Sequence, residues 1–305
     1  MTTSFIEGVL TGSIQSSTSV LYAALGEVVV ERAGVINLGV EGTMLMGAVT
    51  GFMVTAQTGS ALLGVVAGGL AAGVFNLILA YLVVTRKANQ LASGLALMFF
   101  GLGLSALIGK PYVGQLVHGL DALPIPFLAD LPVIGRILFN HDILIYLMAP
   151  LAALVWWVLF RTKWGLSLRA VGENKVVAFA AGLKPELLQY QAVFIGGVLA
   201  GLGGAHLSLA FAQSWSEGMT SGRGFIAVAL VIFAAWHPLR AVAAALLFGG
   251  ALALQLQLQA RGANISPFLL DMIPYLLTLG VLLFVQKGRK RAMPEGLKAV
   301  FEGTN

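Results

Sequence analysis

Residues 61–85 read ALLGVVAGGLAAGVFNLILAYLVVT, a run without a single charged side chain. A helix needs about 20 mostly apolar residues to cross the hydrocarbon core of a bilayer. The run is long enough, and Asn76 is its only amide side chain. It therefore predicts a membrane-spanning helix.

The composition extends this prediction to the whole chain. Of the 305 residues, 58% are hydrophobic and only 10% are charged, whereas soluble domains carry about 25% charged residues. The surface must therefore face lipid. We predict an all-α fold, a polytopic transmembrane helical bundle that forms one domain over residues 1–305, and no nucleic-acid partner.

Further apolar runs bring the expected number of spans to about nine, within a range of roughly eight to ten. The first run is rich in Ser and Thr, and the seventh is short. A re-entrant piece near the second or seventh run is also compatible with the sequence. The other expected spans lie near Gly8–Val30, Val35–Ala56, Gln90–Ile108, Ile143–Phe160, Leu187–Phe211, Phe225–Trp236, Leu239–Gln259 and Phe268–Gln286.

The basic residues predict the orientation. Most of the 18 Lys and Arg residues fall on the side that holds the C-terminus, and such loops are retained in the cytoplasm. We therefore expect the N-terminus outside, the tail 287–305 in the cytoplasm, and a Pro-rich outer loop over 109–141. The loop 161–185 is then cytoplasmic.

This cytoplasmic loop carries the signals of a short helix. Asn174 is an expected N-cap, Gly182 follows the helix Lys175–Ala181, and Pro185 prevents its continuation. An isolated helix of that length is marginal in water, so we expect it to dock on another surface.

Catalytic and metal-binding patterns are not found in the sequence. There is no phosphate-binding loop, no zinc-protease motif and no cysteine, and the four histidines have no metal-ligand spacing. We therefore expect a non-catalytic chain without a metal or a cofactor of its own.

Polar residues inside the expected spans are the candidates for a solute pathway, because such residues tend to face cavities or protein partners. Asn37 and Glu41 share a helix face, and so do Asn89 and Ser93, while His206 follows a Gly-rich run. Each also has a structural interpretation: a carboxylate bonded to backbone donors, a helix cap, or a packed histidine. The sequence leaves both open.

Three segments carry a resemblance to a known family. They are Glu31–Gly42 (ERAGVINLGVEG), Leu168–Asn174 (LRAVGEN) with Ala180–Leu183 (AAGL), and Gly222–Phe233 (GRGFIAVALVIF). Together they resemble the permease subunits of bacterial ABC importers of the branched-chain amino acid and simple-sugar class. Within that class the chain looks most similar to nucleoside and simple-sugar permeases, over nearly its whole length.

The resemblance implies a bacterial cytoplasmic membrane protein that forms half of a pathway for a nucleoside or a simple sugar. It implies three partners: an ATPase subunit that holds ATP and Mg²⁺, a second related permease in a heterodimer, and an extracytoplasmic substrate-binding lipoprotein. It also implies that the cytoplasmic loop couples to the ATPase, although Lys175, Val176 and Val177 stand where a more Pro- and Ala-rich start is expected. The coupling residues would be Arg169, Gly172, Glu173, Asn174, Ala180 and Gly182.

Three other functions stay open from the sequence. A branched-chain amino acid permease would share the same motifs. An ion-coupled secondary transporter would more often carry paired carboxylates inside its spans, and Glu41 is the one we find well placed. A membrane enzyme would need the catalytic pattern that the sequence lacks.

Overall fold

The computed structural model describes residues 2–262 and 293–302, together with scattered residues between them, and within these it is almost entirely helical. The elements in chain order are α1 (Thr2–Arg32), α2 (Val40–Thr58), α3 (Ala61–Ala80) with the π-helical turn η1 (Tyr81–Thr85), α4 (Gln90–Gly109), η2 (Lys110–Tyr112), β1 (Leu123–Pro124), α5 (Ile134–Leu138), β2 (Asn140–His141), α6 (Ile143–Arg161), α7 (Lys163–Glu173), α8 (Lys175–Ala180), α9 (Pro185–His206) with η3 (Leu207–Phe211), α10 (Arg223–Phe233), α11 (Pro238–Ala260) and α14 (Glu295–Glu302).

Five helical segments among the described residues are long and apolar enough to cross a membrane. They are Ala61–Thr85, Gln90–Tyr112, Ile143–Arg161, Pro185–Phe211 and Pro238–Ala260. The predicted polytopic helical bundle is thus confirmed, whereas the total of nine spans stays a prediction. The expected last span near Phe268–Gln286 falls largely outside the described residues.

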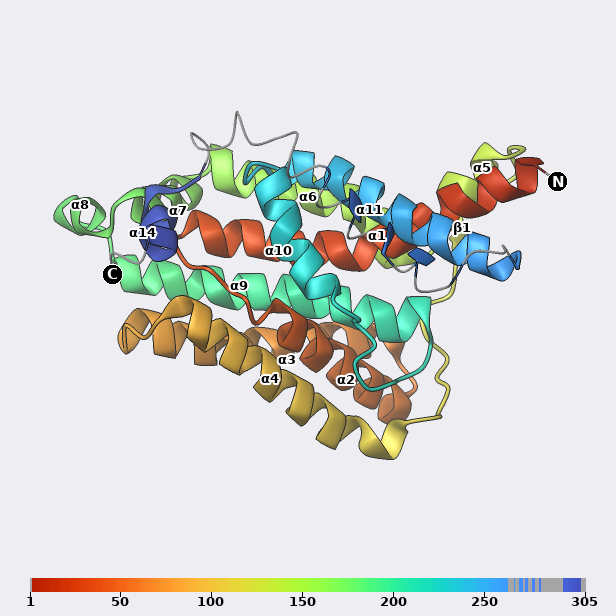
Figure 1. The fold of residues 1–305 in the computed structure, drawn as a ribbon, viewed down its shortest axis with the longest axis horizontal. Coiled ribbons are helices and arrows are strands. Elements are labelled where there is room, and N and C mark those ends of the chain that lie inside the picture. The colour runs from red at the N-terminus through yellow and green to blue at the C-terminus, as the bar shows by residue number, and fades with distance from the viewer. Residues whose placement is uncertain are drawn as a thin grey trace.

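The first helix runs through the middle of the bundle (Figure 1). Every residue from Ser16 to Glu31 is buried, and α1 packs against α6, α9, α10 and α11. Its Ser and Thr side chains therefore meet protein rather than lipid: the Ser13 hydroxyl, for example, donates to the Leu246 carbonyl of α11. This location explains why the first span is less apolar than the others.

Glycines bring α2, α3 and α9 into close contact. A Cβ atom on Gly47 of α2 would collide with Gly201 of α9, and one on Gly68 of α3 would lie 2.5 Å from the Gly47 carbonyl oxygen. Close approach of this kind lets membrane helices associate without a hydrophobic driving force. The four-residue glycine spacing thus serves packing within the chain.

The bundle has two distinct ends (Figure 1). The start of α1, α5 and the antiparallel pair β1–β2 lie at one end, while α7, α8 and α14 lie at the other. As expected, the Pro-rich loop 109–141 contains only short elements. We call these the outer and inner ends, following the orientation that the basic residues predict.

The structure corrects two boundaries. The second span begins at Val40 and not near Val35, because Gly34 adopts a φ of +75° and residues 35–37 are extended or irregular. The loop 161–185 holds the additional helix α7, and its short helix α8 ends at Ala180, one residue earlier than predicted.

Candidate functional site

Glu41 joins two helices that both begin inside the bundle. Its carboxylate accepts hydrogen bonds from the Thr220 hydroxyl (2.6 Å), the Gly222 amide (2.7 Å) and the Gly224 amide (2.6 Å). Gly222 is the N-cap of α10 and has a φ of +82°. A carboxylate at the positive N-terminal end of a helix is electrostatically favourable. Glu41, in the first turn of α2, thus fixes the start of α10.

This junction lies deep in the bundle. Glu41 is 17 positions before Thr58, the last residue of α2, which places it roughly 26 Å along the helix from that outer end at 1.5 Å per residue. The neighbouring residue Thr43 bonds to Asn76 of α3. Asn76 in turn lies about two and a half turns before Thr85, the last residue of η1. Two helices therefore start within the membrane-spanning part of the fold.

Asn37 belongs to a segment without regular structure, residues 33–39, that other elements hold by their side chains. The Asn37 amide N–H donates to Glu27 of α1 (2.9 Å), and its Nδ2 donates to Oδ1 of Asn76 (3.2 Å). The Ile36 N–H donates to Gln90 of α4, and Gln189 of α9 donates to the Ala33 carbonyl. Asn37 thus contributes to a fully bonded polar network.

Asn76 connects this network to α9. Its Nδ2 donates to the Val193 carbonyl at 3.0 Å, while its Oδ1 accepts from Asn37 and from the Thr43 hydroxyl. The side chain is completely buried. The Asn76 side chain therefore forms hydrogen bonds with three other segments of the chain.

Asn89 and Ser93 lie at the inner end of α4. The exposed Asn89 is the N-cap, and its side chain accepts from the Ala92 N–H at 3.0 Å. Ser93 is buried one turn further on. Neither residue bonds to Glu41 or to Asn37 among the described contacts.

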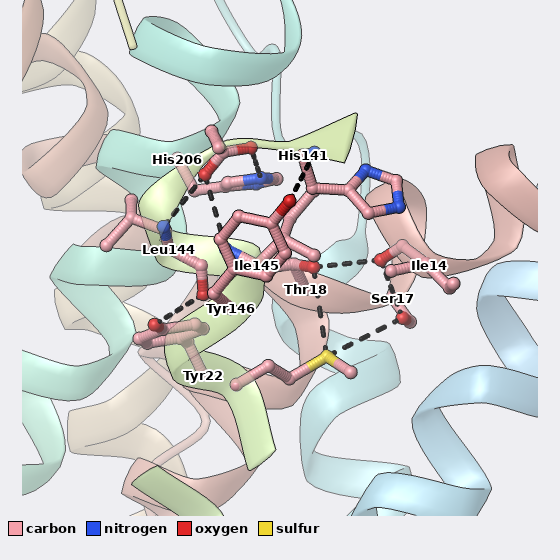
Figure 2. Close-up of polar contacts among 11 residues, drawn as sticks. Ile14, Ser17, Thr18, Tyr22, His141, Leu144, Ile145, Tyr146 and His206 are labelled. Carbon is pink, nitrogen blue, oxygen red and sulfur yellow. Dashed lines mark hydrogen bonds and ion pairs between the residues drawn. The ribbon is translucent and has the colours of Figure 1, made fainter. Parts of the chain in front are cut away.

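His206 lies elsewhere, in a polar cluster near the outer end that brings together α1, α6 and α9 (Figure 2). Its Nε2 is 3.6 Å from Asp142, which caps α6 by accepting from the amides of Leu144 and Ile145. The Tyr22 hydroxyl of α1 donates to the Leu144 carbonyl at 2.9 Å. The structure therefore does not bring His206 together with the other predicted pathway residues.

An open cavity of about 680 Å³ lies next to this cluster at the outer end. Its walls come from α1, α11 and the 109–141 loop and are rich in polar groups, including Glu7, Gln15, Ser16, Arg136, Asn140 and Gln257.

The predicted coupling residues divide into two groups. Arg169, Gly172 and Glu173 attach α7 to the bundle: the Arg169 guanidinium lies 4.9 Å from the centre of the Phe160 ring, and Glu173 accepts from the Glu295 amide of α14. Gly172 packs so tightly that a Cβ there would collide with the Arg32 carbonyl oxygen. These three residues contact other parts of the chain, although Glu173 is exposed.

The second group shapes the projecting helix α8. The Asn174 side chain accepts from the amides of Val176 and Val177, and Gly182 has a φ of +82° just after the helix. Ala180 is the last helical residue and is exposed. Val176 and Phe179 are 78% and 71% exposed. The helix therefore presents apolar side chains to its surroundings.

A cavity of about 920 Å³ lies beneath α8, between it and the inner ends of η1 and α9. Displacement of water by protein atoms and the nearby Lys87 ammonium lower the pKa of Lys175 in its wall, while Glu186 acts in the opposite direction. The projecting helix and the cavity together make the inner end an irregular surface.

Sequence reasoning missed two features of the site. Glu27 lies inside the first expected span, yet its role in holding Asn37 depends on a contact across ten residues. The segment 212–222 leads from η3 back into the bundle and carries four residues with positive φ: Gln213, Gly218, Ser221 and Gly222. The sign of this segment in the sequence was that the seventh apolar run is too short for a full span.

The described residues contain no group of three or more His, Cys, Asp or Glu side chains that could hold a metal ion.

Comparisons with known proteins cover most of the chain. Residues 9–284 match the family described as branched-chain amino acid transport system / permease component. A putative glucose ABC transporter permease protein of Haloferax volcanii is 40% identical over 268 residues, which are 87% of this chain and 82% of that protein. No solved structure matches.

Two further relatives match about half of their own length. A guanosine ABC transporter permease protein of Bacillus subtilis is 37% identical over 51% of this chain and 50% of that protein. A nucleoside ABC transporter permease protein of Lactococcus lactis subsp. cremoris is 39% identical over 53% of each.

Proposed function

Because the chain belongs to the family of branched-chain amino acid transport system permease components, we propose that it forms half of the path by which an ABC importer moves a sugar or a nucleoside across the bacterial cytoplasmic membrane. The family assignment makes the chain an ABC permease subunit in a membrane. The solute class follows from the relatives, which are named for glucose, guanosine and nucleosides.

The observation that carries the proposal is the exposed apolar face of α8. A six-residue helix is too short to be stable alone in water, and its large apolar side chains are exposed, with Val176 and Phe179 also lining the cavity between α8 and α9. Such a surface is typical of a protein–protein contact. In an ABC permease, the partner at the inner end is the ATPase subunit.

The ATP and Mg²⁺ would be held on that separate subunit, since this sequence has no phosphate-binding loop. Closure of the ATPase would then push on α8, and α7 would carry the force to α1 through the Gly172–Arg32 contact. ATP binding would shift the population of inward- and outward-open states by its different contacts in each.

The proposal includes two further partners. A second, related permease would complete the path, because this chain is proposed to form only half of it. An extracytoplasmic lipoprotein would deliver the solute and set its identity. The local contacts support a positioning role for Asn37 and Glu41, while a direct role of Asn89, Ser93 or His206 toward the solute stays a prediction.

Purification of the tagged chain in mild detergent, with mass spectrometry of the proteins recovered, tests the assembly. We expect an ATPase with a phosphate-binding loop and a second permease. Phe179→Glu should release the ATPase and retain the second permease, whereas Leu116→Glu, exposed in the 109–141 loop, serves as a control that leaves α8 intact. Recovery of the chain without any ATPase, even after crosslinking, would contradict the proposal.

The solute class has its own test and one competing candidate. The family description names branched-chain amino acids, so uptake of labelled guanosine and glucose is measured in competition with leucine. Competition by leucine alone would favour the amino acid. Uptake that survives ATP depletion and stops with an ionophore would instead indicate an ion-coupled transporter.

A further inference from the structure

The segment Ser216–Gly222 combines three properties that rarely occur together in a membrane protein. It is irregular, it lies at membrane depth, and several of its residues are exposed. The inference that follows rests on the proposed transport function and names the surface that meets the solute.

The depth follows from the Glu41 contacts. Thr220 bonds to Glu41, which lies roughly 26 Å along α2 from its outer end. Glu217 precedes Thr220 by three residues, which span at most about 10 Å when fully extended. Glu217 therefore lies more than about 10 Å below the outer end of α2, within the thickness of a bilayer of about 30 Å.

The exposed residues of this segment are polar or glycine. Ser216, Glu217, Gly218 and Ser221 are all exposed, and Phe225 in the first turn of α10 is 44% exposed. By contrast, α10 buries Gly224, Ile226 and Ala227 against the bundle. Figure 1 shows α10 lying across α1 on one face of the molecule. The segment and the outer side of α10 thus form a single surface.

Lipid cannot cover such a surface at low cost. Irregular backbone at membrane depth occurs only where protein buries it or where it lines water. A carboxylate such as that of Glu217 is also costly on a surface that faces lipid at this depth. The segment must therefore face an aqueous space or a space shared with a second permease.

The backbone of the segment is also strained and held in place. Gly218, Ser221 and Gly222 have φ values of 65°, 48° and 82°. Ser221 is strained there, because residues with a side chain rarely adopt a positive φ. Strained conformations persist only where surrounding contacts fix them, and they cluster at functional sites. Here Glu41 accepts hydrogen bonds from Thr220 and Gly222 of the segment and from Gly224 just after it, so Glu41 is a positioning residue for this surface.

We propose that Ser216–Gly222 and Phe225 line the solute path and that Ser216, Glu217 and Ser221 contact the solute there. The hydroxyl and carboxylate groups suit a neutral, hydroxyl-rich solute, to which they offer hydrogen bonds that exchange readily with water. The Ser221 hydroxyl is bonded only at 3.3 Å to the Gly218 carbonyl, so it is available to exchange partners. The aromatic Phe225 adds a surface for the face of a ring.

The chain has no cysteine, which allows a direct test by single-cysteine variants. Ser216→Cys and Ser221→Cys keep the backbone strain unchanged, because Cys differs from Ser only at the γ atom. Val74→Cys is the matched control: it lies on α3, two residues before Asn76, and is 59% exposed. The variants are made in the complete importer in vesicles and treated with a charged methanethiosulfonate reagent.

We expect both serine positions to react at least ten-fold faster than Val74→Cys, because the thiolate forms only in water. Modification should stop uptake, and saturating guanosine or glucose with the binding protein should slow the reaction. If one of the two serine variants does not assemble, the other still tests the inference.

Either of two results would overturn the inference. The first is that both serine variants react as slowly as Val74→Cys, with and without ATP, in complexes that transport normally. Alternatively, both could be modified fully without any loss of uptake. An importer that does not transport before any modification would instead count against the proposed function, so the two failures are distinguishable.

Discussion

Glu41 lies where the first turns of α2 and α10 meet, and the first prediction concerns this single residue. Glu41→Gln keeps the shape of the side chain but places an amide group opposite an N–H donor of Gly222 or Gly224. A buried donor left without an acceptor costs about 1–3 kcal/mol. We expect lower thermal stability of the purified complex and faster proteolysis within residues 212–222.

The matched control is Glu217→Gln, which alters an exposed carboxylate in the same region. Its melting temperature should equal that of the wild type. Equal melting temperatures for both variants would show that the Glu41 bonds do not stabilise the junction.

A second residue-scale prediction concerns Asn76. Asn76→Ala removes one bond to Val193 and two from Asn37 and Thr43. Interhelical hydrogen bonds in membranes contribute about 0.6 kcal/mol each on average, so we expect a loss of about 1–2 kcal/mol in unfolding free energy. Ser105→Ala removes a hydroxyl that bonds only within its own helix and should have a smaller effect, as measured by unfolding in mixed micelles.

At this scale the sequence identified several important residues but not their partners. Asn37 and Glu41 were predicted as pathway candidates because polar groups inside membrane spans are rare. Their bonds to Glu27, Asn76 and residues 220–224 cross between 10 and 183 positions of the chain, and no local pattern encodes such contacts. For Asn89, by contrast, the sequence left a helix cap and a place on the solute path equally open, and the structure shows the cap.

The contact between α7 and the end of α1 sets a prediction at the scale of elements. Gly172→Ala would force α7 away from the Arg32 carbonyl and from Gly34, which itself has a φ of +75°. We expect the variant to retain the ATPase on α8 while ATP hydrolysis no longer drives uptake. Gly103→Ala on α4, where a Cβ meets nothing within 4 Å, should transport normally. Normal coupling in Gly172→Ala would exclude this contact as the route.

The cap of α8 provides another element-scale prediction. Asn174→Ala removes the acceptor for two amides, which costs about 1 kcal/mol in a helix that is already marginal. We expect weaker ATPase binding, measured as faster dissociation in detergent, without a change in permease stability. Asn174→Asp keeps the acceptor and should restore binding; if Asn174→Ala dissociates no faster, the cap is irrelevant to docking.

Elements with strong apolar runs were predictable almost to the residue, as Ala61–Thr85 and Gln90–Gly109 show. The interrupted ones were not, since residues 33–39 and 212–222 take their shape from side chains supplied by distant helices. The helix α7 was missed because Gly165 and Gly172 within it are poor helix formers, while its contacts with Phe160 and α14 hold it in place.

For the whole molecule, the testable prediction is its orientation. Gln115→Cys in the outer loop and Ala180→Cys at the end of α8 are both exposed and introduce a unique thiol. An impermeant maleimide should label Gln115→Cys in intact cells and Ala180→Cys only after permeabilisation. The reverse pattern would invert the bundle and would place α8 on the side without ATPases.

The central position of α1 has a consequence for biosynthesis. The helices that enclose it, α9 and α11, lie more than 150 positions later in the chain. At roughly 5–20 residues per second, the ribosome needs on the order of ten seconds or more to supply them. During that interval the serine-rich segment 13–19 lacks the cover that α9 and α11 later provide. The helix that is translated first is therefore among the last to reach its final surroundings, and chaperones or the insertion machinery have to shelter it until then.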